Sequence, residues 1–577
     1  MAQTAGPKKS TAKPGRPTGD DEAFEIAAPL DMLLSDSALG IGRRLMPNTS
    51  WVRFGWALAK QPRTVLEQAR DLVVELANVL RGTSELAPER SDKRFTDPAW
   101  SENPLMKRAM QAYLAASDTA FSALSAADLG WRDQERMNFV IENVVDAMSP
   151  SNNPVLSPLG YKEFIDTGGA SVGRGAVRLV RDFATKPRVP SMVESDAFRV
   201  GRTVATSLGS VVFQSRVFEL IQYAPRTPKV RSTPLLIVPP VINKFYIVDL
   251  APGRSLVEYF LDQGQQVFVI SWRNPKKRHR EWGFDTYGSA ILDALSTVEA
   301  ITNSDRTHLF ATCSGGTLAS MVASHLTAIG QASRIAGLML GVTVLDQNKA
   351  GVAAALLDAS VAKRAIRSSA SRGYLDGRAM AEVFAWLRPN DLVWRYWVNN
   401  YIQGRKPAPF DVLYWNADTT RMAAALHRDM VQTGLTNSLA EPGGAAMLGT
   451  AVDLSKVTVD TYVIAGIADH ISPWQACYRS ARLFGGDVRF VLSTSGHIAS
   501  LVNPPGNKRA SFRFGPPDSE SADEWLDTSE QHHGSWWPDY VAWLAERSGP
   551  ERDSPKSLGA ADLPPLMAAP GWYVKEK

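Results

Sequence analysis

Cysteine, long apolar runs and an excess of either charge are all scarce in this chain. Only Cys313 and Cys477 occur among 577 residues, which excludes a disulfide framework and is typical of a reducing compartment such as the cytoplasm. The 63 basic and 59 acidic residues leave a net charge of +4, which gives no electrostatic ground for binding nucleic acid. No stretch reaches the roughly 18 uninterrupted apolar residues of a membrane span, so no transmembrane segment is expected.

Metal ligands and phosphate-binding loops are also lacking. None of the eight histidines pairs with a cysteine at ligand spacing and a third partner. No glycine-rich phosphate loop is present either. The sequence therefore predicts neither a metal nor a bound cofactor.

The length and the 44% hydrophobic content predict two domains, preceded by a disordered tail at 1–25 that has basic residues but no apolar signal-peptide run. Apolar residues recur at helical spacing through most of the next part of the chain, which predicts a mainly helical N-terminal domain at 26–220. The remainder, 221–577, is predicted to be an α/β-hydrolase catalytic domain. A helical, tryptophan-rich insertion at about 346–453 is expected to form its cap or lid.

Strands alternate with helical patterns in the second domain. The strands are near-continuous apolar runs at 235–242, 266–272, 308–313, 335–345, 461–467 and 488–493. Such strands with intervening helices indicate a parallel sheet covered on both faces. This pattern is the basis for the α/β class.

One of these strands ends in the letters CSGG at 313–316, and a helical pattern then begins. That is the layout of a nucleophile elbow, which needs small residues two before and two after the nucleophile; Ala311 and Gly315 supply them. The helix N-terminus favours the thiolate form of Cys313, the predicted nucleophile. The alternative is a buried, unreactive core cysteine.

A nucleophile in this fold requires an acid and then a histidine after later strands. Asp469 follows the strand at 461–467, and His497 follows the strand at 488–493. Their order and placement predict a Cys313, His497 and Asp469 triad, with the histidine as base. His470 is a competing base, but it stands next to the acid in the same turn.

The oxyanion hole needs two backbone N–H donors. One is predicted at Ser314, directly after the nucleophile, and the other in the loop that follows the strand at 235–242. Val241 or Ile242 is the expected second donor, because the two prolines before them have no N–H. The sequence leaves this choice open.

Five segments together resemble one known family. They are PPVINKFYIVDL at 239–250, SWRNP at 271–275, CSGG at 313–316, WNADTTR at 415–421 and GHI at 496–498. Over about residues 95 to 515 the chain resembles the polyhydroxyalkanoate synthases, and its CSGG and WNADTTR segments are most similar to the single-subunit class II enzymes. Ala311 stands where the family usually has glycine.

The resemblance implies an acyltransferase that takes (R)-3-hydroxyacyl groups from coenzyme A and joins them into a polyester. Cys313 would carry the acyl group as a thioester, while His497 accepts its proton and Asp469 orients His497. The family also implies a homodimer in the cytoplasm at the surface of polyhydroxyalkanoate granules. An apolar cap containing Trp394 and Trp397 is expected to keep water from the acyl enzyme.

Two other functions compete with polymerisation. A cysteine-dependent α/β-hydrolase, such as an esterase or a polyester depolymerase, would use the same triad with water as acceptor. A scaffold protein of the granule surface would keep the fold without the chemistry, although a complete triad argues against it. Loss of thioester turnover on replacing Cys313 would favour an enzyme, and polymer formation would favour the synthase.

Overall fold

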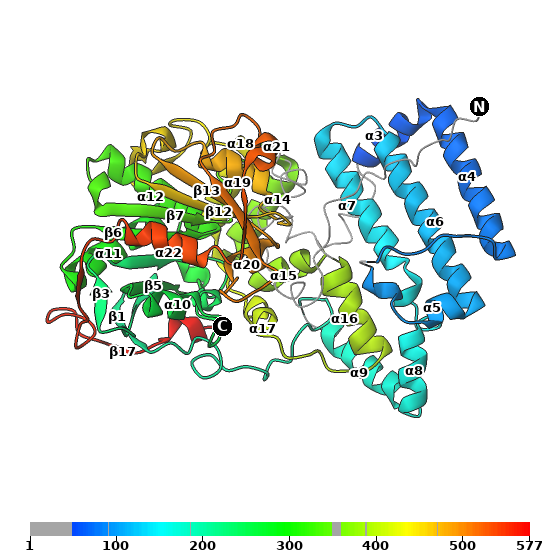
Figure 1. The fold of residues 1–577 in the computed structure, drawn as a ribbon, viewed down its shortest axis with the longest axis horizontal. Coiled ribbons are helices and arrows are strands. Elements are labelled where there is room, and N and C mark those ends of the chain that lie inside the picture. Colours follow the sequence, from blue (N-terminus) through cyan, green and yellow to red (C-terminus); the bar gives the residue numbers. More distant parts are fainter. Residues whose placement is uncertain (1–48, 91, 185, 349–358, 387–388, 470) are drawn as a thin grey trace.

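The computed structural model describes residues 49–577 except 91, 185, 349–358, 387–388 and 470. The predicted disordered tail at 1–25 lies outside these residues. Figure 1 shows helices of the N-terminal part on one side and a large sheet wrapped by helices on the other. None of the described helices combines the length and apolar character needed to cross a bilayer.

The N-terminal part is helical, as predicted. Its longer helices are α3 (Thr49–Ala59), α4 (Pro62–Arg81), α6 (Pro104–Ala126), α7 (Trp131–Ala147), α8 (Pro158–Asp166) and α9 (Ala170–Ala184). Local sequence sets their ends: Pro62 begins α4, and Gly82 with φ +80° ends it. The side chain of Asn103 accepts the first free N–H groups of α6.

The sheet has 11 strands in the order β15-β14-β13-β12-β7-β6-β4-β5-β2-β1-β17. Its centre is parallel and contains the six predicted strands: β4 (Leu235–Val238), β5 (Val267–Trp272), β6 (Thr307–Thr312), β7 (Ile335–Gly341), β12 (Thr461–Gly466) and β13 (Val488–Ser493). Almost all their residues are buried, which explains the continuous apolar runs.

The sheet edges are antiparallel and consist of strands that the sequence analysis did not predict. The edge strands are β1 (Gly209–Gln214), β2 (Phe218–Tyr223), β14 (Ser511–Gly515), β15 (Gln531–His533) and β17 (Met567–Ala568). The sheet thus starts at β1, before residue 220. The domain division at 220 stays a prediction.

Helices cover the sheet on either side. α11 (Phe284–Thr302) and α12 (Ser314–Ala328) pack on each other and on β4 and β6. α10 (Leu256–Asp262) and α22 (Trp537–Ala545) instead share an aromatic cluster in which Phe260 and Tyr540 both contact Phe310 of β6. These layers bury β6 completely and hold in place the strand end from which the elbow starts.

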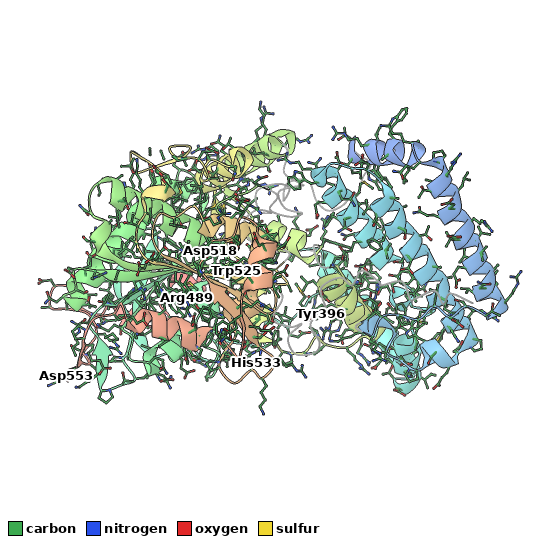
Figure 2. The ribbon with its side chains drawn as sticks, turned by 45° about the horizontal axis from the view of Figure 1, so that its top comes forward. Tyr396, Arg489, Asp518, Trp525, His533 and Asp553 are labelled. Carbon is green, nitrogen blue, oxygen red and sulfur yellow. The ribbon has the colours of Figure 1, made fainter. Side chains whose placement is uncertain are left out.

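The predicted cap is helical where it is described, with residues 349–358 outside the described part. It contains α14 (Ala359–Arg372), α15 (Gly377–Ala385), α16 (Arg395–Trp397), α17 (Asp411–Ala417) and α18 (Ala424–Thr436). Two π-helical segments, Asn390–Trp394 and Val398–Ile402, flank α16. In Figure 1, α16 lies beside α8 and α9, and Figure 2 labels Tyr396 of α16 at this junction.

The tryptophans expected over Cys313 instead contact the N-terminal part. Trp394 packs edge-on against Trp397, which packs against Tyr401. Trp397 Nε1 donates to Asn152 O at 3.2 Å, and the Tyr401 hydroxyl donates to Asp182 at 2.9 Å. Trp394 and Trp397 therefore lie at the interface between the N-terminal part and the rest of the chain. These contacts do not support the expectation that the two side chains keep water from Cys313.

Candidate active site

Cys313 sits between β6 and α12 with φ +50° and ψ −122°, which is unusual for a residue with a side chain. Such a conformation costs about 1–3 kcal/mol and persists only where neighbouring bonds hold it. Cys313 N donates to Gly341 O at 2.8 Å, and Cys313 O accepts the N–H of Thr317 at 3.1 Å. The result is a strained strand-to-helix turn with the thiol at its apex, as a nucleophile elbow requires.

The two glycines after Ser314 let other backbone segments approach this turn. A Cβ on Gly315 would lie 2.4 Å from Val238 O and 2.6 Å from Pro239 O. A Cβ on Gly316 would lie 2.1 Å from the hydroxyl of Thr343. Both positions therefore need glycine for close approach, although neither has positive φ.

Ala311 stands in the middle of the sheet. It is fully buried and pairs with Val238 of β4 on one side and Leu340 of β7 on the other. As an ordinary residue of a parallel strand, it has no need for the conformational freedom of glycine.

His497 and Asp469 meet next to the elbow. His497 begins α20 (His497–Leu501), and its Nδ1 lies 2.7 Å from Asp469 Oδ2. The other carboxylate oxygen accepts the N–H groups of Ile471 and Ser472, both at 2.9 Å. Because both oxygens are engaged, Asp469 holds the imidazole in one orientation.

Cys313 lies close enough to His497 for its side chain to help raise the pKa of the imidazole, so the structure brings the three predicted residues together. They are almost fully buried: 5% of Cys313, 4% of Asp469 and 2% of His497 is exposed. The competing base, His470, lies outside the described residues.

Charge decides the protonation of this cluster. Burial lowers the pKa of His497, but the Asp469 carboxylate and the Cys313 side chain outweigh it and raise the pKa from 6.5 to about 10. The raised pKa favours the protonated imidazolium form of His497 at neutral pH. The N-terminus of α12 adds its positive dipole end at the same point.

The predicted oxyanion donors lie around the same turn. Ser314 is the first residue of α12, ahead of the first intrahelical N–H donor at Thr317, so its N–H has no carbonyl one turn back. Val241 N donates to the hydroxyl of Ser314 at 3.1 Å. The Val241 N–H can therefore donate to an oxyanion only if its hydrogen bond to the Ser314 hydroxyl breaks. The choice between Val241 and Ile242 as second donor stays a prediction.

Two further residues of the resemblance are structural in their contacts. The buried Asp249 accepts hydrogen bonds from the hydroxyls of Ser207 and Ser255, at 2.6 and 2.8 Å. Trp415 Nε1 donates to Lys244 O at 2.7 Å. Among the described residues, no group of three or more His, Cys, Asp or Glu side chains is arranged to hold a metal ion.

Sequence reasoning missed two residues that contact the backbone of the elbow or of the loop beside it. Thr343 donates to Cys313 O at 3.4 Å and to Gly341 O at 3.0 Å. Lys244, in the segment beside the elbow, is 2% exposed. Nothing in the apolar run at 335–345 indicated that Thr343 contacts the elbow. A lysine between two apolar segments, in contrast, could have indicated that Lys244 is buried and hydrogen bonded.

A sheet of this topology with a cysteine at the elbow defines an α/β-hydrolase-type acyl-transfer scaffold. Comparison with known families agrees: residues 244–504 match the alpha/beta hydrolase fold. Residues 91–260 match the family described as poly-beta-hydroxybutyrate polymerase N-terminus.

Known proteins narrow the class. Poly(3-hydroxyalkanoate) polymerase 1 of Ectopseudomonas oleovorans is 44% identical over 90% of this chain and 92% of its own length. Polymerase 2 of the same organism is 44% identical over 87% of this chain and 89% of its own length. The polymerase subunit of Cupriavidus necator is 38% identical over 86% and 85%. The chain belongs to the poly(3-hydroxyalkanoate) polymerase family.

Proposed function

We propose that this chain polymerises (R)-3-hydroxyacyl groups from coenzyme A thioesters through an acyl thioester on Cys313. The observation that carries the proposal is the buried contact of Cys313 at the elbow with His497, which Asp469 holds. The polymerases named above support the product assigned to this site. The chemistry is acyl transfer without a cofactor.

In the first step, the Cys313 thiolate attacks the thioester carbonyl of the substrate. Backbone N–H groups at Ser314 and in the 241–242 loop stabilise the oxyanion. The Cys313 sulfur–carbon bond forms, the bond to the coenzyme A sulfur breaks, and the departing thiolate takes the proton from His497. One thioester replaces another at little free-energy change, so the acyl group stays activated.

In the second step, the 3-hydroxyl of another acyl unit or of the growing chain attacks the acyl enzyme. His497 accepts the hydroxyl proton, the ester bond forms and the Cys313 thiolate leaves. This restores the imidazolium and thiolate of the starting state. Asp469 keeps the imidazole aligned throughout and assists deprotonation of the hydroxyl.

If water instead of a hydroxyl attacked the acyl enzyme, the reaction would be hydrolysis. The near-complete burial of the triad restricts water and supports polymerisation. The curated relatives named above also favour polymerisation over the esterase or depolymerase alternative.

We further propose that the protein acts in the cytoplasm at the granule surface and as a homodimer. Exposed apolar side chains on the N-terminal helices support a surface contact; they include Leu66, Leu80, Ile165, Val177 and Val180. Both cysteines are free, in keeping with a reducing compartment. Sedimentation of the purified protein, with and without polymer granules, tests both assemblies.

The function is tested by supplying (R)-3-hydroxyacyl-coenzyme A of increasing acyl length and measuring released thiol and insoluble polymer together. The proposal expects polymer in proportion to thiol. Thiol release with free hydroxy acid and no polymer would establish the hydrolase instead. The length series also reveals the preferred substrate.

A further inference from the structure

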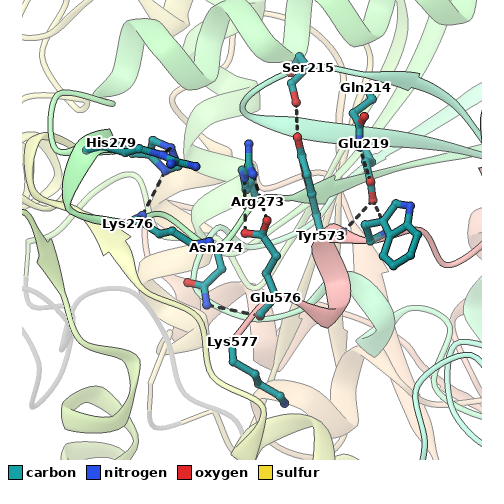
Figure 3. A network of polar contacts seen from close by, with 12 residues as sticks. Gln214, Ser215, Glu219, Arg273, Asn274, Lys276, His279, Tyr573, Glu576 and Lys577 are labelled. Carbon is teal, nitrogen blue, oxygen red and sulfur yellow. Dashed lines mark hydrogen bonds and ion pairs between the residues drawn. The ribbon is translucent and has the colours of Figure 1, made fainter.

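The last eight residues of the sequence, 570–577, contact β2 through Glu219 and contact Lys244, which follows the loop beside the elbow. Figure 3 shows the polar network that holds them. Its second residue, Gly571, has a φ of +80°, and a Cβ there would lie 2.4 Å from a carboxylate oxygen of Glu219. That oxygen accepts the N–H groups of Trp572 and Tyr573, both at 3.0 Å. Glu219 of β2 is therefore the anchor of the segment.

Further contacts fix its course. The Tyr573 hydroxyl donates to Ser215 O at 2.7 Å, and the Arg273 guanidinium lies 4.6 Å from the centre of the Tyr573 ring. Arg273 also forms an ion pair with Glu576 at 3.1 Å. The segment is thus bound along its length.

Lys244 is the point where this segment meets the active-site loop. Its ammonium group donates to Glu576 O at 2.7 Å and to Tyr573 O at 3.3 Å. Burial lowers the pKa of Lys244 to about 8, against the opposing charge of Asp418. Without the two carbonyls, a buried ammonium would lose its hydrogen-bond acceptors, and such a loss is costly.

The loop that ends in Lys244 lies on the elbow. Val241 N donates to the hydroxyl of Ser314, and the carbonyls of Val238 and Pro239 lie against Gly315. A shift of Lys244 therefore moves the backbone N–H groups proposed to bind the oxyanion.

The same loop is tied to the 415–421 segment. Thr420 N donates to Ile242 O at 3.2 Å, and the Lys577 ammonium lies 2.7 Å from Asp418 Oδ1. Residues 570–577 thus hold both sides of the loop.

We propose that residues 570–577 act through Lys244 as a positioning element of the acyl-transfer site, holding the 239–244 loop so that its N–H groups face the oxyanion. The inference rests on the proposed function, since it assumes a tetrahedral intermediate at Cys313. It assigns Lys244 and Glu219 positioning roles and no contact with the substrate.

Two reactions of one thiol separate this role from general stability. Acylation by (R)-3-hydroxyacyl-coenzyme A passes through an oxyanion, whereas alkylation by iodoacetamide displaces iodide and forms none. Single-turnover release of coenzyme A gives the first rate, and mass spectrometry of Cys313 gives the second.

The variants are a chain ending at residue 569, Lys244→Met and the two combined. We expect acylation to fall about ten- to hundredfold in each single variant, with alkylation within about twofold of the native rate. The combined variant should be no slower than the slower single one, because both changes release the same loop.

A second pair of variants, at Glu219, tests the proposal even if the shortened chain does not fold. Glu219→Ala removes the anchor, while Glu219→Gln keeps an amide oxygen that accepts the same N–H groups. The first should lower the ratio of acylation to alkylation and the second should keep it. Lys575→Ala, at an exposed site in the same segment, is the matched control and should leave both rates unchanged.

Variants with the native ratio of the two rates would overturn the positioning role. An equal fall of both rates in all of them would overturn it too, because the segment would then support the nucleophile or the whole fold. Native protein that is alkylated at Cys313 but never acylated would instead contradict the proposed function.

Discussion

Cys313 is held in a strained turn whose conformation does not depend on its sulfur. Cys313→Ser should therefore fold normally yet lose at least about 10³-fold in polymer formation, because a serine ester discharges the thioester energy and the hydroxyl is a weaker nucleophile. Cys477→Ala is the control, since Cys477 lies buried in α19 (Trp474–Ala481). Released thiol measures both, and a Cys313→Ser enzyme with native turnover would refute the assigned nucleophile.

The raised pKa of His497 makes a prediction about stability. A group that binds its proton more tightly when folded stabilises fully below its unfolded pKa of about 6.5. That contribution is lost as the pH rises through the folded pKa of about 10. The native protein should therefore exceed His497→Gln in unfolding free energy by more at pH 7 than at pH 10.5. Urea titrations at both pH values measure this, and a difference that grows with pH would contradict it.

At the residue scale, the proximity of Cys313, His497 and Asp469 could be predicted because chain order and strand ends restrict where an acid and a histidine stand; their catalytic roles stay a prediction. The Lys244 contacts could not be predicted, since Lys244 and Glu576 are 332 positions apart and no periodicity links them. Nor does the sequence reveal that Val241 N–H is already bound to Ser314.

At the scale of elements, the elbow depends on α12 lying against the end of β4. Gly315→Ala would place a methyl group 2.4 Å from Val238 O, a backbone atom that cannot move freely. We expect a loss of about 1–3 kcal/mol in unfolding free energy and a larger loss of acylation. In Gly55→Ala, the added Cβ would meet nothing within 4 Å apart from its own stretch of α3, so this change should be neutral or slightly stabilising. Thermal unfolding and single-turnover assays compare the two, and equal effects would contradict this packing.

The central strands could be predicted because burial on both faces makes them continuously apolar. The edge strands could not. β1 is partly exposed, and β2 is wholly buried but contains Glu219 and Gln222, so neither shows a simple pattern. Glu219 is buried because it accepts bonds from residues near the other end of the chain.

At the scale of the whole molecule, the N-terminal helices and the 390–402 segment share an interface that the sequence did not reveal. The side chain of Asn390 donates to Asp146 at 2.6 Å, and Asn400 donates to Ser191 O at 2.7 Å. Tryptophan clustering led to the prediction of an apolar cap over the acyl enzyme and did not indicate this interface. The joint therefore couples the N-terminal part to the same polypeptide stretch that leads into the 415–421 segment.

Two glycines of α9 test this joint. A Cβ on Gly175 would lie 2.0 Å from Tyr401 O, whereas a Cβ on Gly173 would meet nothing within 4 Å. Gly175→Ala should loosen the N-terminal helices and speed their release by limited proteolysis. Gly173→Ala should stabilise α9 by about 0.5–1 kcal/mol. Equal cleavage rates for the two variants would show that this contact does not hold the parts together.

The central claim is that Cys313 carries the acyl group. The most direct measurement mixes the enzyme with one equivalent of (R)-3-hydroxyacyl-coenzyme A, quenches it in acid and locates the added mass by peptide mass spectrometry. The account predicts a hydroxyacyl adduct on the Cys313 peptide that forms as coenzyme A is released. Release of coenzyme A with no adduct there, or with an adduct on another residue, would contradict it.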